Sequence, residues 1–370
     1  MKIVCFVENL EERSGWGRYS LEVISALKAQ GDDVLVFCNA TNPAVDAPQI
    51  DVLPDPIAFN RIARMRILRP FVLSRVLRER EFMPDIIHCF VEPYAPFAAK
   101  LSRQSGAPFV LTAHGTYAVR SLADVSFGPL QKQAYRVASM IVCISAYTQK
   151  RLRMFEPDLP TAVIPNGVRI PTLDSGHNPK EPLLLSVGAL KERKGYRYVL
   201  EALPQIAQAT PSVTYVAVGD QPDSAYARSL REIVERLGLQ QRVTFKEGIS
   251  DVELDDLYRR ARVFVLTPVS APLNFEGFGL VYLEANARGV PVVGSFENGG
   301  EDAIVDGRTG YLTKPCNPQD IAEKVTRLLQ LPDATYAAWS AECRSWARSR
   351  SWHRTVDRYR DLYCSLTNKA

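Results

Sequence analysis

Residues 274–285 read Asn-Phe-Glu-Gly-Phe-Gly-Leu-Val-Tyr-Leu-Glu-Ala, a stretch that predicts a glycine-bearing loop turning directly into a helix. Gly277 and Gly279 have no Cβ, so the backbone of this loop can approach a ligand closely. The amides of Gly279, Leu280 and Val281 would be the unpaired donors of the first helical turn. Free N–H groups and the positive end of the helix dipole favour a negative charge. The stretch therefore predicts an anion-binding site.

Two glutamates flank this predicted anion site. Glu276 precedes the glycines, and Glu284 lies five residues past Gly279, about 7.5 Å along the helix. Two carboxylates in these positions can hold two separate groups of hydroxyls with a phosphate between them, which suits a nucleotide sugar. A helix that starts with glycine and carries glutamates on a solvated face is the plain alternative, because short motifs often match by chance.

The motifs that follow this helix favour the functional interpretation. Residues 289–294 read Gly-Val-Pro-Val-Val-Gly, and the runs Asn-Gly-Gly-Glu (298–301) and Asp-Gly-Arg-Thr-Gly-Tyr-Leu (306–312) come next. This passage resembles the C-terminal half of retaining glycosyltransferases of family 4 (glycosyl transferases group 1), whose signature is a Glu-x7-Glu motif in such a loop and helix. The resemblance covers nearly the full length. It implies an α/β GT-B fold: two Rossmann-like, doubly wound parallel-sheet domains facing a central cleft.

Length and composition agree with two ordinary globular domains. The chain has 370 residues, of which 46% are hydrophobic and 23% charged. Its net charge of +4 gives no reason to expect a nucleic-acid partner. The seven cysteines lack a Cys-x2-Cys spacing, so buried free thiols are expected rather than a zinc or disulfide framework. The apolar N-terminal run is too short for a signal peptide and no run is long enough to span a membrane, which predicts a cytoplasmic protein.

Strand-like and helix-like runs alternate along the chain, which predicts parallel βαβ units. We predict an N-terminal domain over 1–168, a linker over 169–182 and a C-terminal domain over 183–351, and Ser145 is expected to cap a helix. The resemblance implies that the first domain binds the acceptor, that the second binds the nucleotide sugar, and that a C-terminal helix (352–370) completes the first. The expected strands are 3–7, 34–38, 86–90, 109–112 and 141–144, then 183–187, 213–218, 243–245, 263–266 and 291–293.

A second glycine-bearing stretch, Ser-Gly-Trp-Gly-Arg-Tyr at 14–19, follows the first strand and precedes a helix expected to begin near Tyr19. An ordinary strand-to-helix turn explains it equally well. The stretch resembles the N-terminal glycine loop of the family. This resemblance implies that Gly17 lies near the donor phosphate and that Gly15 and Trp16 bind the acceptor, although Trp16 stands where the family often has a small residue.

His114 comes directly after the expected strand 109–112, a position from which its side chain can face a ligand. A structural histidine is the plain alternative. The family has a histidine at this place, which implies a catalytic role for His114 in contact with the donor sugar near its sixth carbon.

A basic stretch, Val-Gly-Ala-Leu-Lys-Glu-Arg-Lys-Gly-Tyr at 187–196, also follows a strand. A cation here can balance the charge of a diphosphate leaving group, whereas a solvated basic loop is the plain alternative. Lys194 matches the lysine of the family, but Ala189 stands where the family usually has an arginine. Either Arg193 reaches the diphosphate instead, or Lys194 acts largely alone, or the site is weakened.

The segment Asn60–Arg80 carries seven arginines among apolar residues, and Pro70 breaks or kinks it. Such a basic amphipathic segment can lie on an anionic membrane surface, which predicts peripheral contact with the inner face of the cytoplasmic membrane. The solvated face of a structural helix is the commoner explanation.

The resemblance implies retaining transfer of a hexosyl group from GDP-mannose or a UDP-hexose to a glycan or lipid-linked acceptor of cell-surface polysaccharide or glycolipid synthesis. His114, Lys194 and Glu276 are the expected catalytic residues. Since no double-aspartate motif with a clear metal role is present, we expect neither a metal nor another cofactor. The expected donor-binding residues are Gly17, Arg193, Lys194, Glu276, Gly277, Phe278, Gly279, Leu280, Val281 and Glu284.

Other classes of protein remain open at this point. A phosphorolytic enzyme or a nucleotide-sugar epimerase can use the same fold, although the Glu-x7-Glu loop speaks against the epimerase. A non-catalytic sugar-binding scaffold is conceivable because of Ala189, whereas the presence of His114, Lys194, Glu276 and Glu284 favours an enzyme.

Overall fold

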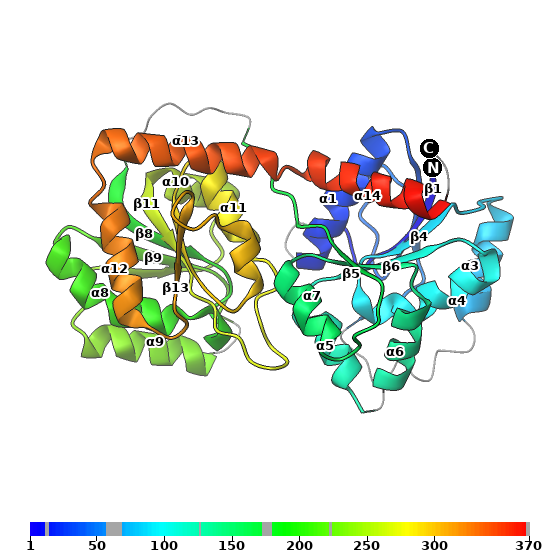
Figure 1. Ribbon diagram of the computed structural model, residues 1–370, viewed down its shortest axis with the longest axis horizontal. Coiled ribbons are helices and arrows are strands. Elements are labelled where there is room, and N and C mark those ends of the chain that lie inside the picture. The colour runs from blue at the N-terminus through cyan, green and yellow to red at the C-terminus, as the bar shows by residue number, and fades with distance from the viewer. Residues whose placement is uncertain (12–14, 57–68, 126, 172–179, 222–223, 368–370) are drawn as a thin grey trace. The chain divides into compact units, whose positions relative to one another are not determined.

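The computed structural model describes residues 1–11, 15–56, 69–125, 127–171, 180–221 and 224–367, with the backbone alone at 69–71. The chain divides into two compact units. The N-terminal unit comprises Met1–Asn166 and Trp352–Ala370, and the C-terminal unit comprises Gly167–Ser351 (Figure 1). The two units are described separately below.

The described part of the N-terminal unit contains a seven-stranded, fully parallel sheet in the order β3-β2-β1-β4-β5-β6-β7. Its central strands are buried along their whole length, as expected for a parallel sheet covered on both faces. The strands are β1 (Lys2–Phe6), β2 (Asp33–Cys38), β3 (Gln49–Asp51), β4 (Ile86–Cys89), β5 (Phe109–Ala113), β6 (Met140–Cys143) and β7 (Thr161–Val163).

Helices cover both faces of this sheet (Figure 1). The first helix, α1, packs against the C-terminal helix α14, and α4 packs against α3 and α6. Ser145 caps α7 as predicted, because its side chain accepts a hydrogen bond from the Thr148 amide at 3.0 Å. The helices are α1 (Gly15–Ala29), α3 (Arg69–Glu79), η2 (Glu92–Tyr94), α4 (Ala95–Ser105), α5 (Thr116–Ala123), α6 (Gly128–Val137), α7 (Ala146–Arg153) and α14 (Trp352–Thr367).

The C-terminal helix α14 is held to the N-terminal unit by a buried polar network and by aromatic packing. The hydroxyls of Tyr359 and Tyr19 lie 2.5 Å apart, and the Tyr363 hydroxyl lies 2.5 Å from His88 Nδ1. His88 Nε2 lies 2.8 Å from the hydroxyl of Thr112 on β5. Burial of each aromatic side chain stabilises the fold by about 1.5–3 kcal/mol, so α14 contributes strongly to this unit although it comes last in the chain.

The C-terminal unit repeats this architecture with a six-stranded parallel sheet in its described part, in the order β10-β9-β8-β11-β12-β13. Helix α8 packs against α9 and α12, and α11 packs against α13 (Figure 1). The strands are β8 (Glu181–Val187), β9 (Thr214–Val218), β10 (Val243–Lys246), β11 (Ala261–Val265), β12 (Val292–Ser295) and β13 (Gly310–Thr313). The helices are η3 (Glu192–Lys194), α8 (Tyr196–Ala209), α9 (Ser224–Arg236), α10 (Asp251–Arg260), α11 (Leu280–Ala287), η4 (Gly299–Ala303), α12 (Pro318–Leu329) and α13 (Asp333–Ser349).

All ten predicted strands are present, with ends that shift by one or two residues. The prediction missed β3 and β7, which are three residues long and only partly buried, and it missed β13. Each of these three strands begins with a polar residue or glycine, which weakens its apolar pattern. Strand β8 begins at Glu181, inside the predicted linker, and Gly167 and Val168 belong to the C-terminal unit. Residues 172–179 lie outside the described residues.

The prediction that a loop precedes Tyr19 was wrong, because α1 already begins at Gly15. Gly15, Trp16 and Gly17 therefore form the first helical turn rather than a glycine loop. The first turn of a helix makes no backbone hydrogen bonds to preceding residues through its amides, so two glycines are tolerated there. The prediction of buried free thiols also needs correction: five of the seven cysteines are buried as predicted, whereas Cys316 is exposed and Cys364 is partly exposed.

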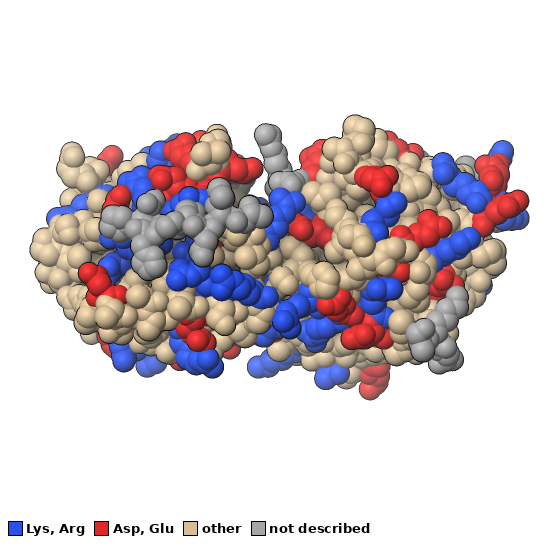
Figure 2. Space-filling model, turned by 90° about the horizontal axis from the view of Figure 1, so that it is seen from above, with Lys and Arg blue, Asp and Glu red and all other residues tan. Residues whose placement is uncertain are grey.

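Charge is dispersed over the surface that Figure 2 shows, with acidic and basic side chains interspersed on both units. Within the described ranges, no helix is long and apolar enough to cross a membrane.

Of the basic segment Asn60–Arg80, residues 60–68 lie outside the described residues. The rest includes α3, which buries Leu73 and Leu77 and exposes Arg75. The membrane contact of this segment stays a prediction.

Candidate active site

The candidate site residues of each unit lie where the strand order of its sheet reverses. This reversal falls between β1 and β4 in the N-terminal unit and between β8 and β11 in the C-terminal unit. In open parallel sheets, ligands bind outside the carboxyl ends of the strands at such a switch point. The segments that leave these four strands carry Trp16, Glu92, Lys194 and Glu276.

Gly195 places the basic stretch against the end of β11. Its φ of +74° is a left-handed conformation that favours glycine, and a Cβ here would lie 1.9 Å from the carbonyl oxygen of Thr267. The amide of Val269 donates a hydrogen bond to the carbonyl of Arg193 at 2.8 Å. These two contacts hold η3 beside the loop that leads to Glu276.

Arg193, Lys194 and Glu276 form one ion-pair cluster. Lys194 Nζ lies 2.7 Å and Arg193 Nη1 lies 2.8 Å from the same oxygen, Glu276 Oε2. The Glu276 and Lys194 side chains are each 12% exposed. Burial opposes ionisation of Glu276, but the charges and hydrogen bonds of Lys194 and Arg193 outweigh it and hold the pKa of the carboxyl below its usual value. The cluster therefore carries two cations and one carboxylate at the switch point.

The loop after Glu276 turns into α11, as the opening stretch predicts. Gly279 is the N-cap of α11 and has a φ of +74°. A Cβ on Gly279 would lie 2.5 Å from the ring of Tyr282, so a side chain cannot be added without displacing that ring. Leu280 and Val281 form the first turn of α11, and Phe278 is buried behind it. The helix thus starts at a tightly packed glycine turn, as predicted.

Gly299 holds this loop from the other side, a contact that was not predicted. The Gly299 amide donates to the carbonyl of Glu276 at 2.9 Å, and a Cβ on Gly299 would lie 2.0 Å from the carbonyl oxygen of Gly277. Asn298 caps η4 and orients this turn through its buried side chain. The Asn-Gly-Gly-Glu run at 298–301 thus supports the loop that carries Glu276.

Glu284 lies on α11 and is 8% exposed. Its Oε2 accepts a hydrogen bond from the hydroxyl of Tyr258, on α10, at 3.1 Å. No pattern in the sequence indicated that Tyr258 is a site residue. Arg288 packs over the Tyr258 ring and donates a hydrogen bond to the backbone carbonyl of Glu284 at 3.0 Å. The Glu284 carboxylate is therefore pre-oriented by its neighbours.

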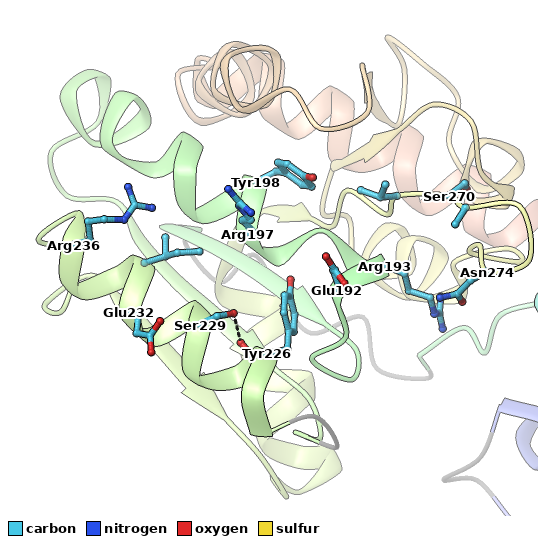
Figure 3. Close-up of a pocket in the computed structure, with 13 residues that line it drawn as sticks. Glu192, Arg193, Arg197, Tyr198, Tyr226, Ser229, Glu232, Arg236, Ser270 and Asn274 are labelled. Atoms are coloured by element: carbon cyan, nitrogen blue, oxygen red, sulfur yellow. Dashed lines mark hydrogen bonds between the residues drawn. The ribbon is translucent and has the colours of Figure 1, made fainter.

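A pocket of about 740 Å³ opens beside the ion-pair cluster, between the start of α8, the length of α9 and the loop that follows β11 (Figure 3). Arg193 and Asn274 lie at one end of it, Arg236 lies at the other, and Tyr226 and Glu192 lie between (Figure 3). Among the predicted site residues, Arg193 lines this pocket, whereas Lys194, Glu276 and Glu284 do not. Arg193 thus connects the pocket with the cluster.

In the N-terminal unit, the first turn of α1 lies against the residues that follow β5. Trp16 is 9% exposed, and its ring centre lies 4.5 Å from that of Tyr117. Tyr19 packs edge-on against the His114 ring, with the ring centres 4.6 Å apart. The structure thus brings Trp16 and His114 into neighbouring positions through aromatic contacts that sequence spacing does not show.

His114 directly follows β5 and is largely enclosed. Its Nε2 atom is buried and makes no hydrogen bond to any of the described residues. Burial lowers the pKa of His114 to about 4, although a hydrogen bond with the Phe90 backbone opposes this shift. The imidazole is therefore neutral near pH 7, and its Nε2 atom is a buried nitrogen without a partner among the described residues.

Glu92 is a buried carboxylic acid that the sequence interpretation missed. It is 0% exposed, and its Oε1 accepts a hydrogen bond from the His114 amide at 2.6 Å. Burial raises the pKa of Glu92 to about 7, against hydrogen bonds from backbone amides and the Trp16 side chain that lower it. Glu92 follows the predicted strand 86–90 just as His114 follows the next strand, so the same strand-end rule could have found it.

The described residues contain no group of three His, Cys, Asp or Glu side chains placed to hold a metal ion. The charged groups of the C-terminal switch point are instead two cations and carboxylates.

Two family profiles together cover most of the chain. "Glycosyltransferase Family 4" matches residues 13–170, and "Glycosyl transferases group 1" matches residues 173–346. The chain is 30% identical over 317 residues to the GDP-mannose-dependent alpha-(1-6)-phosphatidylinositol monomannoside mannosyltransferase of Mycolicibacterium smegmatis, covering 81% of this chain and 78% of that one. It is 28% identical over 360 residues to the glycogen synthase of Mycobacterium tuberculosis, covering 88% of this chain and 84% of that enzyme.

Among solved structures, HepE of Anabaena, in complex with UDP and glucose, matches with a TM-score of 0.73 and 22% identity over 99% of both chains. Two Rossmann-like parallel-sheet units with this similarity define a glycosyltransferase of the GT-B fold. The chain belongs to glycosyltransferase family 4.

Proposed function

We propose that this protein is a retaining hexosyltransferase that uses a nucleotide diphosphate sugar. The observation that carries the proposal is the convergence of Arg193, Lys194 and Glu276 next to the glycine turn of α11. Cations and outward-facing amides are what a departing diphosphate requires, because negative charge develops on it as the sugar leaves. Two of the predicted catalytic residues, Lys194 and Glu276, lie in this cluster.

Lys194 and the amides from Gly279 to Val281 are assigned to the leaving diphosphate. Ala189 cannot provide the cation that the family usually has at that position. Arg193 is the replacement best supported by geometry, because Arg193 and Lys194 pair with the same oxygen, Glu276 Oε2. Binding of a diphosphate would then draw both cations from Glu276, which frees its carboxylate to accept hydrogen bonds from the hydroxyls of the donor hexose.

Glu284 is assigned to the ribose hydroxyls and His114 to the donor sugar. In the proposed step, an acceptor hydroxyl oxygen forms a bond to the anomeric carbon as the bond from this carbon to the diphosphate oxygen breaks. The hydroxyl proton goes to the departing phosphate oxygen. Attack from the face that the nucleotide leaves retains the anomeric configuration. Since Lys194 and Arg193 balance the developing charge, the step is proposed to need no metal ion.

The names of relatives support a choice of substrates. The relative of M. smegmatis is named for GDP-mannose and phosphatidylinositol monomannoside, and the HepE structure contains UDP and glucose. GDP-mannose or a UDP-hexose is therefore proposed as donor, and a glycan or lipid-linked molecule as acceptor. Peripheral membrane contact through Asn60–Arg80 and a cytoplasmic location remain part of the proposal.

A donor panel tests the proposal. Calorimetry with UDP-, GDP- and ADP-sugars should show one preferred donor for the wild type. The same titrations are made on Glu284→Ala and on the control Glu323→Ala, which replaces an exposed glutamate of α12. Donor binding should weaken roughly thirtyfold in Glu284→Ala and stay unchanged in the control. Equal binding by Glu284→Ala would contradict the ribose assignment, and no binding to any donor would favour a scaffold.

Turnover then separates the enzyme classes. With the preferred donor and a panel of glycan and lipid-linked acceptors, NMR of the product should show the anomeric configuration of the donor, with or without EDTA. An inverted product would contradict the retaining mechanism. If inorganic phosphate is the one acceptor that receives the sugar, the protein is a phosphorolytic enzyme. If the sugar is converted without any acceptor, the protein is an epimerase.

A further inference from the structure

The N-terminal unit contains a buried carboxyl group to which the proposed transfer assigns no role. Glu92 begins η2, directly after β4, and β4 lies between β1 and β5 in the sheet. The segments that leave β1 and β5 carry Trp16 and His114. Glu92 is therefore placed at the strand-order reversal of this unit, between two residues that were predicted to bind substrate.

Glu92 is tied to two other segments of this unit. Its Oε1 accepts a hydrogen bond from the His114 amide at 2.6 Å. Its backbone carbonyl accepts a hydrogen bond from the side chain of Gln131 on α6. Glu92 and Gln131 are both 0% exposed. Glu92 thus links the segment after β4 to α6 and to the residue that follows β5.

These contacts restrain the backbone at His114, and with it the position of the imidazole ring. They are not contacts with a ligand. The His114 amide is the first backbone donor after β5, and its direction sets where the imidazole points. Gly115, the next residue, has a φ of +103° and can rotate easily, so the strand alone does not fix this turn. A carboxyl oxygen at 2.6 Å supplies the missing restraint.

We propose that Glu92 is a positioning residue for glycosyl transfer: its carboxyl group fixes the backbone turn at His114 in the arrangement that receives the substrates. The inference rests on the proposed function for its catalytic part. Glu92 itself does not touch the reacting atoms, because it is fully buried.

The contact is tested first without substrate. Labelling the four histidines with ¹⁵N gives a small set of backbone amide signals, and loss of one signal in His114→Gln assigns His114. In Glu92→Leu, which removes the acceptor, the His114 amide signal should move upfield more than any other histidine signal. In Glu92→Gln, which keeps an acceptor oxygen, it should stay near its wild-type position.

Activity is measured on the same proteins. Since small displacements of positioned groups can cost on the order of 10²-fold in rate, Glu92→Leu should lower kcat by that order, and Glu92→Gln should recover most of the loss. Glu156→Leu is the matched control. Glu156 is 8% exposed in the same unit and bonds Arg136 at 2.8 Å, so its loss tests general destabilisation. If Glu92→Leu does not fold, Glu92→Asn is used instead. The asparagine side chain is one methylene shorter, so its oxygen cannot reach the His114 amide as the glutamate oxygen does.

The outcomes separate the two proposals. An unmoved His114 amide in Glu92→Leu overturns the inference, and so does a moved amide with a kcat equal to that of Glu156→Leu. A moved amide, a reduced kcat and rescue by glutamine support it. If the wild type transfers no sugar from any donor, the proposed function fails and with it the catalytic role of Glu92, whereas the amide shift still reports the contact.

Discussion

Lys194 Nζ lies 2.7 Å from Glu276 Oε2, and Arg193 Nη1 reaches the same oxygen at 2.8 Å. Two cations on one carboxylate oxygen form a cluster with an excess positive charge. The arrangement keeps Glu276 ionised despite its burial. It also preorganises two cations beside the start of α11, where an anion is favoured.

Lys194→Ala should lower the rate of nucleotide release from the donor by about 10²–10³-fold, the range found when one group that stabilises developing charge is removed. Circular dichroism should remain unchanged, because Arg193 still pairs with Glu276. The control is Lys324→Ala, on α12, whose lysine pairs with Glu323 at the surface. A Lys194→Ala enzyme as active as this control would contradict the assignment.

Glu284→Ala should weaken nucleotide binding by about 2 kcal/mol, roughly thirtyfold in Kd, the value of a lost hydrogen bond to a charged group. Tyr258→Phe removes the hydroxyl that orients Glu284 at 3.1 Å. Its effect should be smaller, about 1 kcal/mol or fivefold. Calorimetry on both variants checks this order, and a larger loss in Tyr258→Phe would show that the tyrosine contacts the ligand itself.

Gly279→Ala should destabilise the C-terminal unit more than Gly307→Ala. Both glycines have nearly the same φ, +74° and +75°, so both substitutions cost the left-handed penalty of roughly 1–2 kcal/mol. Only at position 279 does the new Cβ meet a neighbour, the ring of Tyr282, whereas at position 307 it meets nothing within 4 Å. An additional loss of about 1–3 kcal/mol is expected in Gly279→Ala from this overpacking. Chemical unfolding of the two variants measures the difference, and equal losses would mean that the Tyr282 ring moves aside.

Glu92 should make the protein less stable as the pH rises. Burial raises the pKa of this carboxyl from 4.5 to about 7, so the folded state holds the proton more tightly than the unfolded state. The stabilising contribution is full below about pH 4.5 and is lost as the pH rises through about 7, a change of about 3 kcal/mol. The side chain in Glu92→Gln carries no charge, so its contribution does not change with pH. The free energy of unfolding of this variant should therefore rise relative to that of the wild type as the pH increases over this range. Unfolding curves at a series of pH values test this, and a constant difference would contradict it.

His114 should remain neutral over the pH range in which free imidazole titrates. Because burial lowers its pKa to about 4, the C2 proton signal of His114 should not move between about pH 5.5 and 8. NMR of the wild type checks this, with His114→Gln to assign the signal. A shift centred near neutral pH would mean that the ring is more solvated than its buried Nε2 indicates.

Much of the fold follows from patterns local in sequence. Apolar runs of three to six residues predicted ten strands, because a parallel sheet buries both faces and leaves such runs continuous. The start of α11 was predicted from Gly279, and the cap of α7 from Ser145, because both depend on one or two neighbouring residues. The start of α1 was placed too late, because glycines permit a turn without requiring one.

The sequence by itself determined ten of the strands, the starts of α7 and α11 and the residue types available for chemistry, since these follow from local backbone preference and apolar patterning. Only the tertiary structure decided which of these residues meet. Arg193 and Glu276 are 83 residues apart in the chain, and Glu92 and His114 are 22 apart. Tyr19 and Tyr359 are separated by 340 residues. Such contacts arise from the order of strands in the sheet, which brings distant strand ends to one edge and which no short stretch of sequence encodes.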